Sequence, residues 1–140
     1  MITKSKFNTH TEPLFKKCSV LPIAQLIEYS KLLFMHNYTQ QRLPSCFNNT
    51  WVTNQERRMN EERTLRNEDD YFIHLARTKT TERLPAYTMP NLWNNLQDTN
   101  IKNEQSLARF KRRMKSNLLN NLASQIICNR TNCPTCSALV

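Results

Sequence analysis

The sequence contains no glycine in its 140 residues. Glycine is the residue that adopts a positive φ at the lowest cost, and tight hairpin turns and phosphate-binding loops depend on it. Its absence therefore argues against a P-loop, a dinucleotide-binding fingerprint and a hairpin-rich β fold. A chain of this length is the size of one ordinary domain, or of a fragment of one.

Long apolar runs are missing as well. The longest, Leu32–Met35, is far too short to span a bilayer, and the first residues contain no apolar stretch typical of a signal peptide. We therefore expect an intracellular protein, nuclear or cytoplasmic, with no membrane partner. Hydrophobic residues make up only 39% of the chain and the mean hydropathy is −0.68, so we expect a modest core.

Negative charge is scarce relative to positive charge. The chain has 20 Lys and Arg against 11 Asp and Glu, which gives a formal net charge of +9. A surplus of this size favours polyanionic partners, and nucleic acid first among them.

Two segments carry apolar residues at helical spacing. The first predicts a helix over about 22–40, with Pro22 at its start. The second predicts a helix that begins after Asn103 as the cap, with Glu104 and Gln105 in its first turn. Its expected apolar stripe is Leu107, Phe110, Met114, Leu118, Leu122 and Ile126. A shorter helical turn is expected from Thr11 to about Cys18.

The connections between these helices read as irregular. Residues 48–70 are charged and rich in Asn, which predicts a solvated loop, either without regular structure or with one weak helical stretch around 55–66. Residues 71–78 predict a short extended segment. Pro85 and Pro90 argue against a long helix over 83–96, where Tyr87 and Trp93 are expected to serve as packing anchors. The fold class that follows is mainly α: a small helical domain or domain fragment, residues 1–127, with long irregular, Pro-containing connections and a separate tail, residues 128–140.

The second long helix carries the candidate nucleic-acid-binding residues, which we expect on the side opposite its apolar stripe: Arg109, Lys111, Arg112, Arg113 and Lys115. Cationic side chains on a helix can neutralise successive phosphates of RNA or DNA without reading their sequence. The alternative is an ordinary solvated helix face.

The tail "CNRTNCPTC" supplies the candidate metal ligands, Cys128, Cys133 and Cys136. The spacing of the last two is that of half a structural zinc site, but a fourth ligand is missing from the tail. The sequence therefore predicts an incomplete zinc knuckle that binds Zn weakly, with reduced, partly exposed thiols as the alternative. His36 has no partner at catalytic spacing, and we expect it at the edge of its helix.

Five blocks of the sequence together resemble a known family. They are "HTEPLFKKCSVLPIAQLIEYSKLLFMHNY", "RLPSCF", "LRNEDDYFIHLARTKTTERLPAYTMPNLWNNL", "SLARFKRRMKSNLL" and "CNRTNCPTC". In this order they resemble the C-terminal, post-polymerase region of reverse transcriptases encoded by non-LTR (LINE-type) retrotransposons, over about residues 9–136. The resemblance implies an accessory role in holding RNA or DNA, beside an upstream polymerase domain that this chain does not contain.

The resemblance also implies that the chain is not an enzyme. The polymerase chemistry of that family belongs to an aromatic-Ala-Asp-Asp turn that holds two metal ions, and this sequence has no such turn. Asp69 and Asp70 are adjacent acids, but they follow a polar stretch that predicts a loop. Two alternatives remain open: a structural piece that packs against the polymerase domain, and a non-functional relic of an open reading frame.

Overall fold

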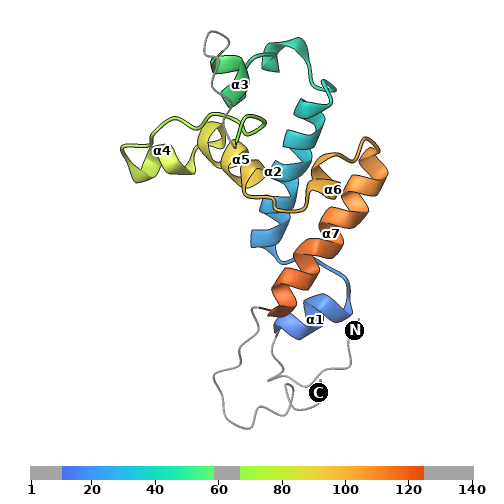
Figure 1. The fold of residues 1–140 in the computed structure, drawn as a ribbon. Helices are drawn as coiled ribbons and strands as arrows, with labels where there is room; N and C mark the ends of the chain where they lie inside the picture. Colours follow the sequence, from blue (N-terminus) through green and yellow to red (C-terminus); the bar gives the residue numbers. More distant parts are fainter. Residues whose placement is uncertain (1–10, 59–66, 125–140) are drawn as a thin grey trace. The chain divides into compact units, whose positions relative to one another are not determined.

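The computed structural model describes residues 11–58 and 67–124, and the fold over these residues is mainly helical (Figure 1). The prediction of a mainly α fold is therefore confirmed. The α-helices are α1 (Thr11–Lys17), α2 (Ile23–Thr39), α3 (Asn54–Arg57), α4 (Lys79–Arg83), α5 (Pro85–Asn94), α6 (Thr99–Lys102) and α7 (Leu107–Ser124). A 3-10 helix, η1 (Ser45–Phe47), follows α2.

The chain divides into two compact units. The first consists of Met1–Tyr29 with Lys111–Val140, and the second is Ser30–Phe110. Both boundaries fall inside a helix, since α2 and α7 each contribute residues to both units. The predicted boundary between residues 127 and 128 lies outside the described residues.

Helices α1 and α2 end in the same way, with a residue other than glycine in the left-handed region. Ser19 after α1 and Gln41 after α2 both have a φ of 52°. In each case the N–H of the next residue, Val20 or Arg42, donates to the carbonyl five residues earlier. The N–H of the left-handed residue donates to the carbonyl three residues earlier. This is the Schellman arrangement, in which glycine is the usual left-handed residue because it has no Cβ.

We expect glycine at these two positions to stabilise the fold. Ser19→Gly and Gln41→Gly should each raise the free energy of unfolding by about 0.5–1 kcal/mol, because relief of the left-handed strain exceeds the entropy that glycine adds to the unfolded chain. Ser116→Gly, in the exposed middle of α7, is the matched control and should destabilise by about 0.5 kcal/mol. Urea denaturation of the three variants measures the differences, and a loss of stability at both helix ends would contradict this account.

Helix α5 has ten residues and contains a proline in its interior, whereas the sequence argues from Pro85 and Pro90 only against a long helix over 83–96. Pro85 occupies the first turn, where its missing N–H costs nothing, and Pro90 lies in the middle of the ten-residue helix. Pro90 cannot donate to the carbonyl of Ala86, four residues earlier. The indole Nε1 of Trp51 donates to that carbonyl instead, at 3.1 Å.

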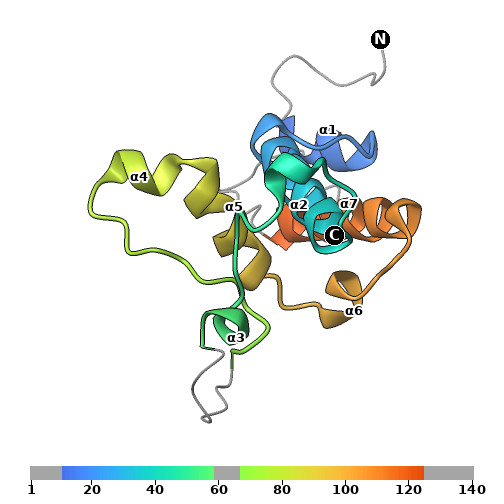
Figure 2. The same cartoon turned by 90° about the horizontal axis from the view of Figure 1, so that it is seen from above.

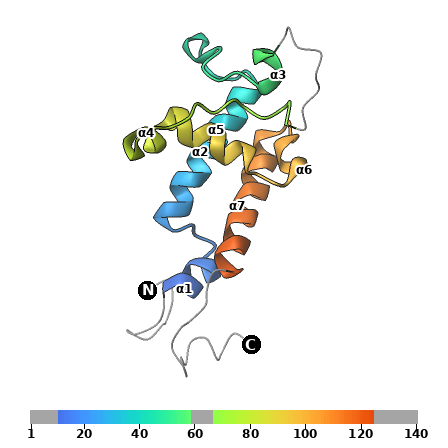
Figure 3. The same cartoon turned by 60° about the vertical axis from the view of Figure 1, so that its left-hand side comes forward.

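Within the second unit, α5 crosses the C-terminal part of α2 (Figure 3), and the bond from Trp51 fastens its first turn. Segment 72–84 leads away from α2 and ends with α4, which directly precedes α5 (Figures 1 and 2). Every residue from Arg77 to Ala86 is exposed.

The start of α7 corrects a prediction. The helix begins at Leu107, not directly after Asn103, and the Ser106 carbonyl accepts the first bond, from Phe110 N–H at 2.9 Å. Asn103 instead ends α6, while Glu104 and Gln105 precede α7 rather than forming its first turn. The sequence did not reveal α6, a single turn capped by Asp98, whose side chain accepts from Asn100 N–H at 3.0 Å.

The expected loop at 48–70 is ordered in its described parts. Thr53 and Glu56 form a reciprocal capping box at the start of α3, with bonds of 3.1 and 2.8 Å. Thr53 also pairs with Tyr71 in an isolated antiparallel bridge. The side chain of Asn94 then binds both backbone groups of Tyr71, at 3.0 and 2.8 Å, as a neighbouring strand would. Residues 59–66 of the expected loop lie outside the described residues.

The core of the second unit is aromatic. Phe110 is fully buried, with the His36 ring stacked at 4.1 Å and the Trp93 ring at 6.2 Å between centroids. Trp93 is therefore a packing anchor, as the sequence predicts, and Tyr87 is half-buried. The expectation of an edge position for His36 is wrong, because its side chain is 0% exposed and its Nε2 lies 2.6 Å from the Glu104 carbonyl.

Candidate nucleic-acid interface

All five predicted nucleic-acid-binding residues lie on α7 with exposed side chains. The helix contains no Asp or Glu from Leu107 to Ser124, so no acidic side chain of α7 offsets this charge. The predicted apolar stripe is buried at Phe110, Met114, Leu118 and Leu122, and its first member, Leu107, is half-buried. Ile126, the last member of the expected stripe, lies outside the described residues.

The helical geometry divides the five cations into two rows. Arg109, Arg112 and Arg113 are spaced i, i+3 and i+4 and therefore share one side of α7, which we call the arginine row. Lys111 and Lys115 are spaced i, i+4 and form a second row, the lysine row, nearer the buried stripe. The prediction that all five share one side is thus too simple, and the two rows can be removed separately in an experiment.

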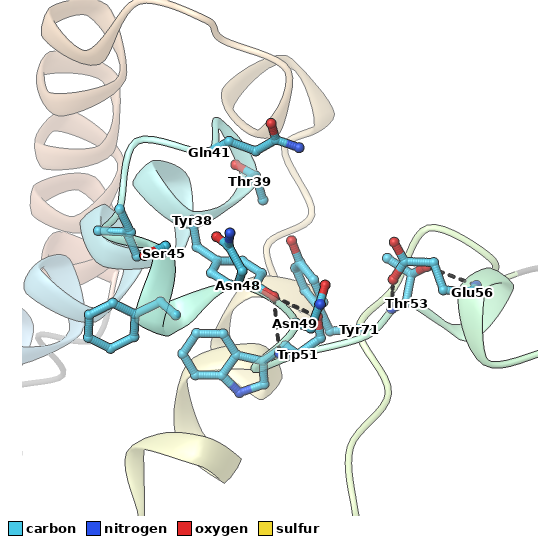
Figure 4. Close-up of a pocket in the computed structure, with 12 residues that line it drawn as sticks. Tyr38, Thr39, Gln41, Ser45, Asn48, Asn49, Trp51, Thr53, Glu56 and Tyr71 are labelled. Atoms are coloured by element: carbon cyan, nitrogen blue, oxygen red, sulfur yellow. Dashed lines mark hydrogen bonds between the residues drawn. The ribbon is translucent and has the colours of Figure 1, made fainter.

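A polar groove lies in the second unit and has a volume of about 530 Å³. Aromatic rings from α2, η1 and the segments that follow form part of its wall: Tyr38, Phe47, Trp51 and Tyr71. The amides of Gln41, Asn48 and Asn49 supply donors and acceptors. In Figure 4, Ser45 lies at one end and Thr53 with Glu56 at the other. Sequence reasoning did not find this groove, because its residues are polar and are brought together only by the fold.

The aromatic wall is held rigidly. The Tyr38 hydroxyl donates to the Trp51 carbonyl at 2.7 Å and accepts from the Trp51 N–H at 3.1 Å. The rings of Phe34 and Tyr38 meet the Trp51 indole at nearly right angles, with centroids 6.2 and 4.9 Å away. Burial raises the pKa of the Tyr71 hydroxyl above its usual value, and the neighbouring Tyr38 and Glu56 add to the rise. Tyr71 therefore stays neutral at physiological pH.

A cation and an aromatic ring stack on each other in the same unit. The guanidinium of Arg57 lies 3.8 Å from the centroid of the Phe72 ring, and the exposed His74 ring meets Phe72 edge-on at 4.8 Å. Arg57 follows Glu56 in the sequence, and Phe72 follows Tyr71. Glu56 and Tyr71 are the ones that line the groove.

The predicted zinc ligands, Cys128, Cys133 and Cys136, lie outside the described residues, so weak zinc binding stays a prediction. The described cysteines, Cys18 and Cys46, are free thiols. Within 11–58 and 67–124, no three His, Cys, Asp or Glu side chains are grouped to hold a metal ion. Of the acidic pair, Asp70 lies 4.0 Å from the ammonium of Lys102.

An apolar patch lies in the first unit, on and just before the N-terminal part of α2. Ile23 is 73% exposed, and Val20, Leu26 and Ile27 are each 45–50% exposed. Isolated exposed apolar side chains are common on soluble proteins, but three at helical spacing with a fourth just before the helix are typical of a surface that another molecule covers.

Comparison of the sequence with family models and with curated proteins, and of the fold with solved structures, gives no match. No helix among the described residues has both the length and the apolar character that crossing a membrane requires.

Proposed function

We propose that the chain is a non-catalytic nucleic-acid-binding protein that contacts the phosphates of RNA or DNA through α7. The observation that carries the proposal is the charge of this helix, which presents five exposed cations and no acidic residue. The formal net charge of +9 supports it, because a basic surface attracts a polyanion over a distance. The resemblance to the post-polymerase region of LINE-type reverse transcriptases fits the same role.

The two rows of α7 predict how binding depends on salt. Each phosphate contact on duplex DNA contributes about 0.9 to the slope of log affinity against log salt. Replacing the arginine row with Gln should therefore reduce the slope by up to about 2.7, the lysine row by about 1.8, and both rows by about 4.5. Fluorescence anisotropy with labelled duplex DNA at several salt concentrations measures these slopes.

The matched control is the pair Lys79→Gln and Arg83→Gln on α4, which removes two exposed cations outside α7. If α7 is the binding face, the control should change the slope less than the lysine-row variant, which removes the same charge. An unchanged slope after removal of all five α7 cations would show that this helix does not contact phosphates.

A second candidate function is favoured by the apolar patch in the first unit. Val20, Ile23, Leu26 and Ile27 form a surface of the kind that packs against another protein domain. On this alternative the chain is a structural piece of a larger assembly, such as the polymerase domain that the resemblance implies. The salt experiment distinguishes the two functions, because in a purely structural piece the weak attraction of a duplex comes from the overall charge, and removal of the lysine row should change the slope no more than the α4 control does.

A further inference from the structure

The geometry points to the polar groove of the second unit as a site for an unpaired base of single-stranded nucleic acid. This inference rests on the proposed function, because it names the form of nucleic acid that the protein prefers. It concerns a different set of residues, however, and these can be altered without touching the charges of α7.

The groove fits a base in both size and chemistry. Its volume of about 530 Å³ lies within the range of ligand-binding sites. Among the described residues that line it, Glu56 is the one ionisable at neutral pH, and its Oε2 is engaged by the Thr53 N–H at 2.8 Å. A planar, uncharged ligand is therefore favoured over an anion. Tyr71 is only 8% exposed, so the half-buried rings of Tyr38, Phe47 and Trp51 are the ones in the wall on which a base can stack. The amide side chains can pair with the polar edges of the base.

The wall and the amides differ in rigidity, which suits such a ligand. The hydrogen bonds between Tyr38 and Trp51 fix the aromatic wall before binding, so that little entropy is lost there. Gln41 and Asn48 are exposed, and their side chains make no hydrogen bond with another described residue. They are thus available to bond a ligand.

Binding of a short oligothymidylate and of a DNA duplex of the same length to the full chain tests the inference. The double variant Gln41→Ala with Asn48→Ala should lose about tenfold in affinity for the oligothymidylate, with no change for the duplex or in the salt slope. Both side chains are exposed, so the fold should be unaffected, as circular dichroism can verify. Gln97→Ala with Asn103→Ala, two exposed amides that do not line the groove, is the matched control.

Tryptophan emission gives a second readout. Trp93 is only 6% exposed, so quenching by a bound base should report on Trp51. In the wild type, oligothymidylate should quench the emission in a saturable way. The double variant should need about a tenfold higher concentration of oligothymidylate for the same quenching. If the double variant binds the oligothymidylate as tightly as the wild type while the α7 variants lose affinity, the inference fails and the proposed function stands. If the wild type binds neither probe, both fail.

Discussion

Replacing His36 with alanine is expected to lower the free energy of unfolding by about 3 kcal/mol. The imidazole is fully buried, stacks on Phe110 at 4.1 Å and bonds to the Glu104 carbonyl at 2.6 Å. Its removal leaves a cavity, which costs about 2–5 kcal/mol for buried side chains of similar size, and takes a donor away from that carbonyl. Chemical denaturation followed by circular dichroism measures the loss.

Two further variants separate the contributions of the ring and of the hydrogen bond. His36→Phe keeps an aromatic ring against Phe110 but has no donor for Glu104, so it should lose less stability than His36→Ala. The buried Nδ1 of His36 has no hydrogen-bond partner among the described residues, and a phenyl ring also removes that unfavourable atom. His74→Ala changes an exposed histidine and should shift the free energy of unfolding by no more than about 0.5 kcal/mol. Equal losses at positions 36 and 74 would refute the assignment of His36 to the core.

The elements predicted correctly are those that depend on residues close together in the sequence. Helix α2 was expected over about 22–40 and is observed at Ile23–Thr39, because Pro22 and the apolar spacing are both local signals. The buried stripe of α7 was predicted for the same reason. The start of α7 was missed by a few residues, since Asn103 can cap either a following or a preceding helix and the single turn of α6 has too few residues to show a period.

The features that were missed depend on residues far apart in the chain. The burial of His36 requires Glu104 and Phe110, which lie on other segments, and a polar residue beside Asn37 gives no sign of either. The groove likewise combines residues from Tyr38 to Tyr71. Periodicity reports only neighbours on one helix, so it could identify the α7 cations but not a site built from loops.

The survival of α5 around Pro90 shows the same dependence on distant residues and leads to the last prediction. Trp51, 35 residues before Ala86, takes over the hydrogen bond that Pro90 cannot make. Trp51→Ala should therefore lower the free energy of unfolding by about 3 kcal/mol, since it removes this bond together with the edge-to-face contacts with Phe34 and Tyr38.

A double-mutant cycle isolates the hydrogen bond itself. Trp51→Phe keeps a ring at this position and removes the N–H, while Pro90→Ala restores a backbone N–H that can reach the Ala86 carbonyl within α5. Because the carbonyl then has a donor from either source, Trp51→Phe should cost about 1 kcal/mol less in the Pro90→Ala background than in the wild type. Denaturation of the four proteins measures this coupling. Strictly additive effects would mean that the indole N–H does not compensate for the proline, and that packing alone holds α5 in place.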